Sequence, residues 1–294
     1  MLYRIKQRGN DNMKVFVLTK KNLIAAGLIL AVIILAVVLA IVCSDRSTDP
    51  NVGTDPSPDP NAQIGNEVES YELAVFAGLQ KELPVYSVSR EDKKIALTID
   101  AAWADDKTEF ILETLDKYNI KATFFLCGFW AEEYPDIVKR IDAEGHQIGN
   151  HTATHPHMNK LSSQQILDEL KKYDDILESI IGKRSTLFRA PYGEYNDNVI
   201  TTVRNAGYEV IQWDIDTVDW REERSAETIL NSVLPKLKSG SIILSHNNGF
   251  KIEQYLPTLI ETALGQGYEF VTIGELLLDG PTIIDVNGVQ KPAN

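Results

Sequence analysis

The feature that most constrains the fold is an alternation of short apolar segments with longer amphipathic ones between Lys94 and Thr272. The short segments predict strands at Lys94–Asp100, Ala122–Leu126, Gln147–Asn150, Leu187–Arg189, Glu209–Asp214, Ser241–His246 and Phe270–Thr272. Apolar residues at helical spacing predict helices at Lys107–Tyr118, Trp130–Glu144, Ser163–Ile181, Asp197–Ala206, Ala226–Leu237 and Gln254–Leu264. Such an α/β alternation indicates a parallel sheet with crossover helices. A closed or nearly closed barrel and an open doubly wound sheet both fit it.

A different kind of segment precedes this region. Leu23–Cys43 is a run of 21 residues without charge or proline. At about 1.5 Å per residue, a helix of this length spans the roughly 30 Å of a membrane hydrocarbon core. Residues 1–22 carry six basic residues and one acidic residue, so the positive-inside rule predicts a cytoplasmic N-terminus. Because bulky Val42 makes a poor site for signal cleavage or for lipidation of Cys43, we expect an uncleaved single-pass anchor in the cell membrane.

The composition after the anchor predicts a linker and then one folded domain. Residues 44–69 are dense in Asp, Pro, Ser, Asn and Gly and lack aromatics, which is typical of a flexible segment. We therefore expect a domain outside the membrane over residues 70–294, with its motifs between residues 94 and 272. The formal charge of −13 argues against nucleic acid as a partner, because phosphate binding needs a basic surface. Two cysteines are too few for a disulfide scaffold.

Reactive side chains follow five of the predicted strands: Asp100, the pair His151 and His155, Arg189, Asp219 and His246. The carboxyl ends of strands in a parallel barrel meet on one rim, so we expect these side chains to lie together. Two histidines four residues apart can converge on one ion in a helical turn or tight loop, and imidazole ligands favour Zn²⁺ over Mg²⁺ or Ca²⁺. Taken singly, each has a plainer interpretation as a turn residue, a structural histidine or part of a polar loop.

Two further segments suggest a substrate site. Arg189-Ala-Pro-Tyr-Gly193 combines a proline of fixed φ with a turn glycine, so its backbone is held rigidly and can present an N–H to an oxyanion. The stretch from Trp213 to Trp220 places three acidic residues between two indoles, a combination that favours sugar rings. The alternative for both tryptophans is a place in the core.

Together these segments resemble the polysaccharide deacetylase family with the NodB homology domain, also known as carbohydrate esterase family four. Its five motifs correspond, in order, to Thr98–Ala102, His151–His155, Arg189–Gly193, Asp216–Trp220 and Leu244–His246. The resemblance implies a distorted (β/α) barrel of about seven strands that hydrolyses N-acetyl groups on a glycan. With the domain outside the membrane, the expected substrate is an N-acetylated cell-wall polysaccharide, peptidoglycan above all. A non-catalytic glycan-binding module and an O-acetyl esterase of the acetylxylan type are the alternatives.

The resemblance also implies a role for each matching residue. His151 and His155 would hold a divalent metal, most readily Zn²⁺, with Co²⁺ possible. Asp100 would be the general base for water, held by Arg189, and His246 the general acid, oriented by Asp219. The remaining matches would bind the substrate: Pro191, Tyr192, Trp220 and Leu244. Among them, the Tyr192 N–H would stabilise the oxyanion, and Trp220 and Leu244 would form the walls of the acetyl pocket.

One position departs from the family pattern. The second Asp of the first motif, the family's usual third metal ligand, is Ala101 here, and alanine cannot bind a metal. The following loop supplies Asp105 and Asp106 and is one residue longer than usual, so a looped carboxylate can take the vacant place. Deacetylase subgroups with an Asp-Ala-Ala-Trp first motif resemble this arrangement. We favour Asp106, although Asp106 and Glu109 also fit a helix capping box, which would leave Asp105 as the ligand.

Overall fold

Strand β2 (Lys94–Ala101) runs through the middle of the domain in the computed structural model, which describes residues 81–293. Its side chains alternate between two faces, as the pleat of a strand requires. Ile95, Leu97 and Ile99 join the large core cluster that also contains the helix side chains, whereas Ala96 packs in a second cluster on the opposite face. The strand thus carries Thr98 and Asp100 on the face away from the helices, where both contact the side chain of Arg189.

The main sheet has the strand order β6 (Glu209–Val210), β5 (Leu187–Phe188), β4 (Gln147–Asn150), β3 (Thr123–Leu126), β2, β8 (Ile242–His246) and β7 (Ile215–Asp216). β9 (Glu269–Phe270) also pairs with β2, and every pair in this sheet is parallel. Within residues 81–293, the end strands β6 and β7 do not pair with each other. The fold is therefore a half-barrel with seven parallel strands in order and β9 as an eighth beside β2, which agrees with the expected distorted barrel and not with full closure.

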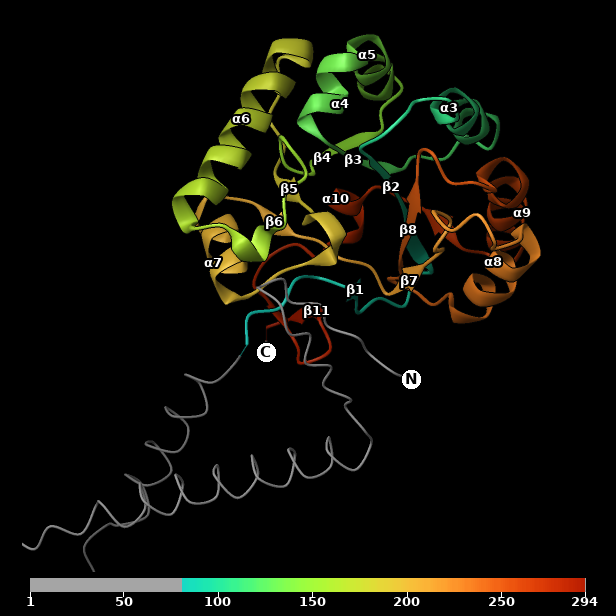
Figure 1. The fold of residues 1–294 in the computed structure, drawn as a ribbon. Coiled ribbons are helices and arrows are strands. Elements are labelled where there is room, and N and C mark those ends of the chain that lie inside the picture. The colour runs from blue at the N-terminus through green and yellow to red at the C-terminus, as the bar shows by residue number, and fades with distance from the viewer. Residues whose placement is uncertain (1–80, 294) are drawn as a thin grey trace, which may run out of the picture. The chain divides into compact units, whose positions relative to one another are not determined.

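Helices cover the outside of this sheet. They are α3 (Thr108–Lys117), α4 (Gly128–Glu133), α5 (Pro135–Ala143), α6 (Ser163–Ile181), α7 (Asp197–Asn205), α8 (Ala226–Val233) and α9 (Ile252–Gly265). Figure 1 shows them as an arc that runs from α7 through α6, α4 with α5, and α3 to α9 and α8. The α6 boundaries match the prediction, and Ser162 with Gln165 forms a capping box at its start.

Some predicted boundaries are wrong for identifiable reasons. The single helix expected over Trp130–Glu144 is two helices, because Pro135 starts α5 after a non-helical Tyr134. The strand expected over Glu209–Asp214 ends at Val210. Beyond it, the Gln212 N–H donates to the Val85 carbonyl at 2.7 Å, and the Asp214 carboxylate accepts from the Ile242 N–H at 2.8 Å, so the chain pairs with other segments there.

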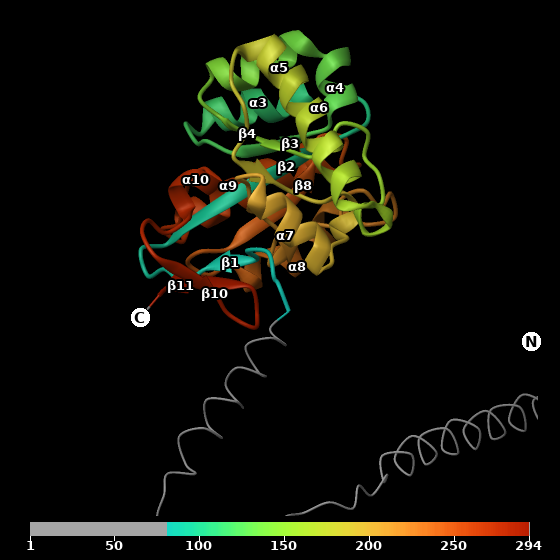
Figure 2. The same cartoon turned by 90° about the vertical axis from the view of Figure 1, so that its left-hand side faces the viewer.

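A small second sheet has the order β1 (Ser87–Val88), β11 (Val289–Pro292) and β10 (Thr282–Ile284), and the sequence patterns did not predict it. Figure 2 shows it at the end of the domain opposite to α4 and α5. Before β1, the Val85 N–H donates a hydrogen bond to the Val210 carbonyl. In β1, the Val88 N–H donates to the Gly240 carbonyl. It thereby links the β6 side of the half-barrel to the segment before β8.

The expected anchor (residues 23–43) and linker (residues 44–69) lie outside the described residues. No helix within residues 81–293 is both long enough and apolar enough to cross a membrane.

Candidate active site

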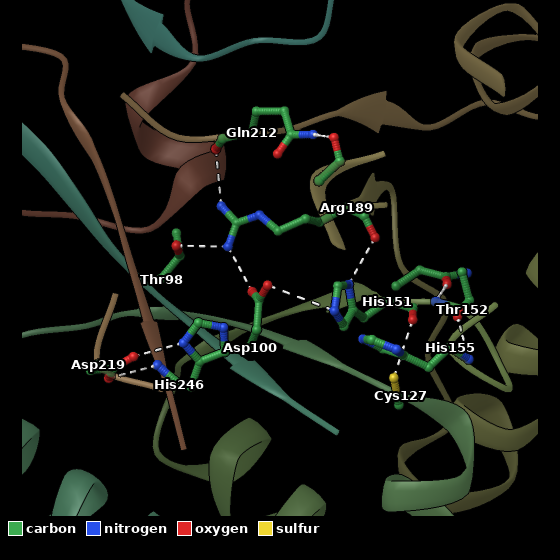
Figure 3. Close-up of polar contacts among 12 residues, drawn as sticks. Thr98, Asp100, Cys127, His151, Thr152, His155, Arg189, Gln212, Asp219 and His246 are labelled. Atoms are coloured by element: carbon green, nitrogen blue, oxygen red, sulfur yellow. Dashed lines mark hydrogen bonds and ion pairs between the residues drawn. The ribbon is translucent and has the colours of Figure 1, made fainter. Parts of the chain in front are cut away.

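A buried ion pair lies at the centre of the site (Figure 3). Arg189 is fully buried; its Nη1 donates to Oδ1 of Asp100 at 2.7 Å and to the hydroxyl of Thr98 at 2.8 Å, and its Nη2 donates to the Gln212 carbonyl at 3.0 Å. Burial alone would raise the pKa of Asp100, but the charge of Arg189 above all, with contributions from the His151 and His246 rings, lowers that pKa below its ordinary value. Asp100 is therefore an oriented carboxylate at neutral pH.

His151 and His155 lie beside this pair on the loop after β4. Nδ1 of His151 is 2.8 Å from the Arg189 carbonyl oxygen, which makes Nδ1 the donor and leaves Nε2 free, 3.7 Å from Oδ2 of Asp100. Burial lowers the pKa of His151 and lowers that of His155 to about 3, so both rings are neutral. Neutral imidazole is the form that binds metals, and Nδ1 of His155 is a buried atom without a hydrogen-bond partner. The pair therefore fits a divalent metal.

Within residues 81–293, the contacts around His151 and His155 do not include the carboxylate expected as the third metal ligand. In the described part of the chain, the group of side chains close enough to share an ion is Cys127, His151 and His155, whose ligand atoms lie within 4.8 Å of one another. Neither Asp105 nor Asp106 belongs to this group. However, α3 starts at Thr108 after Lys107, which makes no side-chain cap, so Asp106 does not form the capping box with Glu109. The objection to Asp106 as a looped ligand is thereby removed.

A second charge pair, His246 with Asp219, lies at the end of β8. Nδ1 of His246 lies 2.7 Å from Oδ1 of Asp219, a fully buried carboxylate whose Oδ2 accepts from the His246 N–H (3.1 Å) and the Tyr255 hydroxyl (2.7 Å). Burial would lower the pKa of His246, but Asp219, with help from Asp100 and Asp216, raises it above its ordinary value. His246 can therefore hold a proton at neutral pH and release it from Nε2.

The two units have a fixed relation because their strands are neighbours. Asp100 and His246 are paired positions in the parallel register of β2 and β8. The sequence prediction that reactive side chains from separate strand ends meet on one rim agrees with this geometry for Asp100, His151, Arg189, Asp219 and His246.

The residues expected to bind the substrate differ in their surroundings. Pro191 and Leu244 are buried, whereas Tyr192 is 55% and Trp220 is 51% exposed. Tyr192 has a φ of 59°, a left-handed conformation that is rare for a residue with a side chain, so its backbone is held in a specific strained shape. That these four bind the substrate stays a prediction.

Sequence reasoning missed four residues of the site: Thr98, Cys127, Gln212 and Tyr255. The alternation along β2 places Thr98 on the same face as Asp100, a signal that was available. Gln212 contributes a backbone carbonyl to Arg189, and Cys127 and Tyr255 are buried side chains whose contacts arise only on folding. No spacing in the sequence reveals such contacts.

Comparisons with known proteins place the chain in a family. The profile described as polysaccharide deacetylase matches residues 87–211. A peptidoglycan-N-acetylglucosamine deacetylase of Bacillus cereus is 37% identical over 202 residues, which cover 67% of this chain and 73% of that relative. The peptidoglycan-N-acetylmuramic acid deacetylase PdaC of Bacillus subtilis is 35% identical over 190 residues, 65% of this chain and 40% of that relative.

Among solved structures, a CE4 family pseudoenzyme from Bacillus anthracis is 34% identical, with a TM-score of 0.63 over 66% of this chain and 68% of that one. A mutant of that protein is described as having restored enzymatic activity. Because the Bacillus cereus relative is similar over most of its own length, and the order of the motifs agrees, the chain belongs to the polysaccharide deacetylase family of amide-hydrolysing enzymes.

Proposed function

We propose that the protein is a membrane-anchored, metal-dependent deacetylase that hydrolyses N-acetyl groups of the amino sugars in peptidoglycan. The observation that carries this proposal is the facing pair of proton-transfer groups, Asp100 held by Arg189 and His246 held by Asp219, on paired positions of neighbouring strands. The two peptidoglycan deacetylases that resemble the chain support the choice of substrate.

Hydrolysis of an amide needs a proton taken from water and a proton given to the leaving nitrogen. Asp100 is oriented by Arg189 to accept the proton of the attacking water as it adds to the acetamide carbonyl. His246 donates from Nε2 to the amine as the C–N bond breaks, which yields acetate and a free amino sugar. Each proton transfer typically accelerates such a reaction by about 10²–10⁴-fold.

His151 and His155 would hold the metal, and Asp106 is our proposed third ligand. When bound, a Zn²⁺-like ion would polarise the acetamide carbonyl and make the attacking water more acidic. Arg189 orients two groups of the site. Its carbonyl oxygen accepts from the ring of His151, and its guanidinium donates to the carboxylate of Asp100. The Tyr192 N–H remains our proposed oxyanion donor, with Trp220 and Leu244 as walls of the acetyl pocket.

The proposal for location comes from the sequence. The uncharged run 23–43 after a basic flank supports an anchor, and the tether of residues 44–69 would leave the domain outside the membrane, next to the cell wall.

The test is acetate release by the purified full-length chain from peptidoglycan, chitooligosaccharides and acetylxylan, with Zn²⁺ or Co²⁺ and after chelation. We expect release from peptidoglycan that depends on metal, and mass spectrometry of the wall fragments should assign the lost acetyl group to one sugar. Asp100→Asn is the matched control, since it should abolish turnover while the bound metal remains. Release from acetylxylan alone would identify an O-acetyl esterase instead.

Ala101 favours a second candidate, a glycan-binding module with little or no turnover. A CE4 family pseudoenzyme is among the solved structures that the chain resembles, which supports loss of turnover as an alternative. Binding alone, however, has no need for the two charge pairs at the site. Binding of glycan without acetate release from any substrate at any metal concentration would establish this second function and refute the first.

A further inference from the structure

A row of aromatic rings passes through His155, one of the two histidines proposed to hold the metal. It consists of Phe129, Trp103, His155, Tyr192 and His157, and we term it the aromatic row. Successive ring centroids lie 6.4, 4.6, 4.6 and 4.5 Å apart. The rings come from the segments that directly follow β2, β3, β4 and β5, so four neighbouring strand ends contribute to one continuous feature.

Three members of the row are open to solvent. Trp103 and Tyr192 are each 55% exposed, and His157 is exposed as well. Leaving large aromatic surfaces in water forgoes about 25 cal/mol for each Å² that burial would gain. Such surfaces grouped beside a site of reactive polar groups are typical of a place where a ligand binds.

The backbone that carries the row is held in unusual conformations. Ala104, His155 and Tyr192 have φ values of 55°, 57° and 59°, in the left-handed region that costs energy for residues other than glycine. The Ala104 carbonyl accepts from Nε1 of Trp130 at 2.8 Å and from Nδ2 of Asn247 at 2.6 Å. These bonds fix the loop that presents Trp103, so little conformational entropy is lost when a ligand meets its indole.

We propose that the aromatic row binds the sugar rings that flank the one being deacetylated, and that Trp103 makes its main apolar contact. This inference rests on the proposed function. The ligand is an oligomer of N-acetylated amino sugars, whose rings present an apolar C–H face to aromatic rings and hydroxyls at their edges. At the end of the row, His157 pairs with Glu194 at 3.0 Å and supplies polar partners for those hydroxyls.

The first experiment measures binding without turnover. Chitohexaose is titrated into the full-length chain, stripped of metal, in a calorimeter. Loss of one aromatic contact predicts about tenfold weaker binding for Trp103→Ala, whereas Trp103→Phe should stay within about threefold. His157→Ala should weaken binding by about two- to fivefold, and it tests the row if the Trp103 variant fails to fold. Ile283→Ala, a 52% exposed residue on β10, is the control that should change nothing.

The second experiment separates flanking sugars from the reacting one. Trp103→Ala should raise KM for chitohexaose about tenfold and leave kcat/KM for the disaccharide within about twofold. Equal losses on both substrates, or wild-type hexamer binding by both Trp103→Ala and His157→Ala, would overturn the inference. If the wild-type chain binds the hexamer through Trp103 but releases no acetate, sugar binding by the aromatic row is confirmed and the proposed deacetylase activity is refuted.

Discussion

At the scale of single residues, the carboxylate of Asp219 bonds two side chains, those of His246 and Tyr255. It accepts from His246 on one side, and Tyr255, a fully buried residue of α9, donates its hydroxyl to Oδ2 at 2.7 Å. Removal of that donor would leave a buried carboxylate oxygen with one partner fewer and strengthen the negative potential at His246.

We therefore predict that Tyr255→Phe raises the pKa of His246 further. Because His246 must be protonated to act as an acid, the alkaline limb of the pH profile of kcat/KM should move to higher pH, with kcat lowered by up to about tenfold. Tyr173→Phe is the matched control, since the Tyr173 hydroxyl donates to the Gly149 carbonyl away from this carboxylate. An unshifted profile in Tyr255→Phe would show that the tyrosine only supports the fold.

Metal content tests the third ligand at the same scale. Asp106→Ala should lower affinity for Zn²⁺ by about 10–100-fold and more than Asp105→Ala does, with the circular dichroism spectrum unchanged. Cys127→Ser should keep its metal, because burial raises the pKa of the Cys127 thiol and its Sγ already donates to the His151 carbonyl at 3.3 Å. Equal metal content in the two aspartate variants would contradict Asp106 as the third ligand. Metal loss in Cys127→Ser would make Cys127 the third ligand instead.

Among the elements, the turn between β8 and α9 positions the acid of the site. A methyl group added at Gly249 would lie 2.2 Å from Oδ2 of Asp219, and this turn is tied to Asp219 by the Phe250 N–H (2.9 Å). Only a residue without a side chain leaves room for the carboxylate in its present position.

Gly249→Ala should consequently displace Asp219 and reduce kcat by at least about tenfold, with a smaller change in KM, as measured by acetate release. Gly265→Ala is the control: it lies at the end of α9 with nothing within 4 Å of the added carbon, and it should keep full activity and gain up to about 1 kcal/mol in unfolding free energy. Full activity in Gly249→Ala would show that the turn relaxes without moving the acid.

The elements also show what sequence can and cannot predict. β4 and α6 have the predicted boundaries, because the apolar period and the Ser162 cap are local signals. β1 and β7 are two residues long and exist through pairing with distant partners, which no local pattern encodes. Within the site, the order of the motifs predicted the pairs Asp100–Arg189 and Asp219–His246. Cys127 and Tyr255 belong to no motif, and only the packing of the fold brings them to the site.

At the scale of the whole molecule, the sequence predicts a membrane anchor ahead of the deacetylase domain. We predict that the full chain sediments with membranes, because a 21-residue uncharged run follows six basic residues. Deletion of residues 1–43 should move it to the soluble fraction with kcat within about twofold on soluble chitooligosaccharides and slower release from intact cell walls. Recovery of the full chain in the soluble fraction would contradict the anchor.

The paired positions of Asp100 and His246 on β2 and β8 have a consequence for how such proteins diversify. The spacing between adjacent parallel strands, about 4.8 Å, is set by backbone hydrogen bonds. The distance between the proposed base and the proposed acid is therefore a property of the sheet and is insensitive to the length of the loops above it. Loops such as the one carrying Trp103 can be exchanged or lengthened to suit another polymer while the reaction chemistry is inherited unchanged.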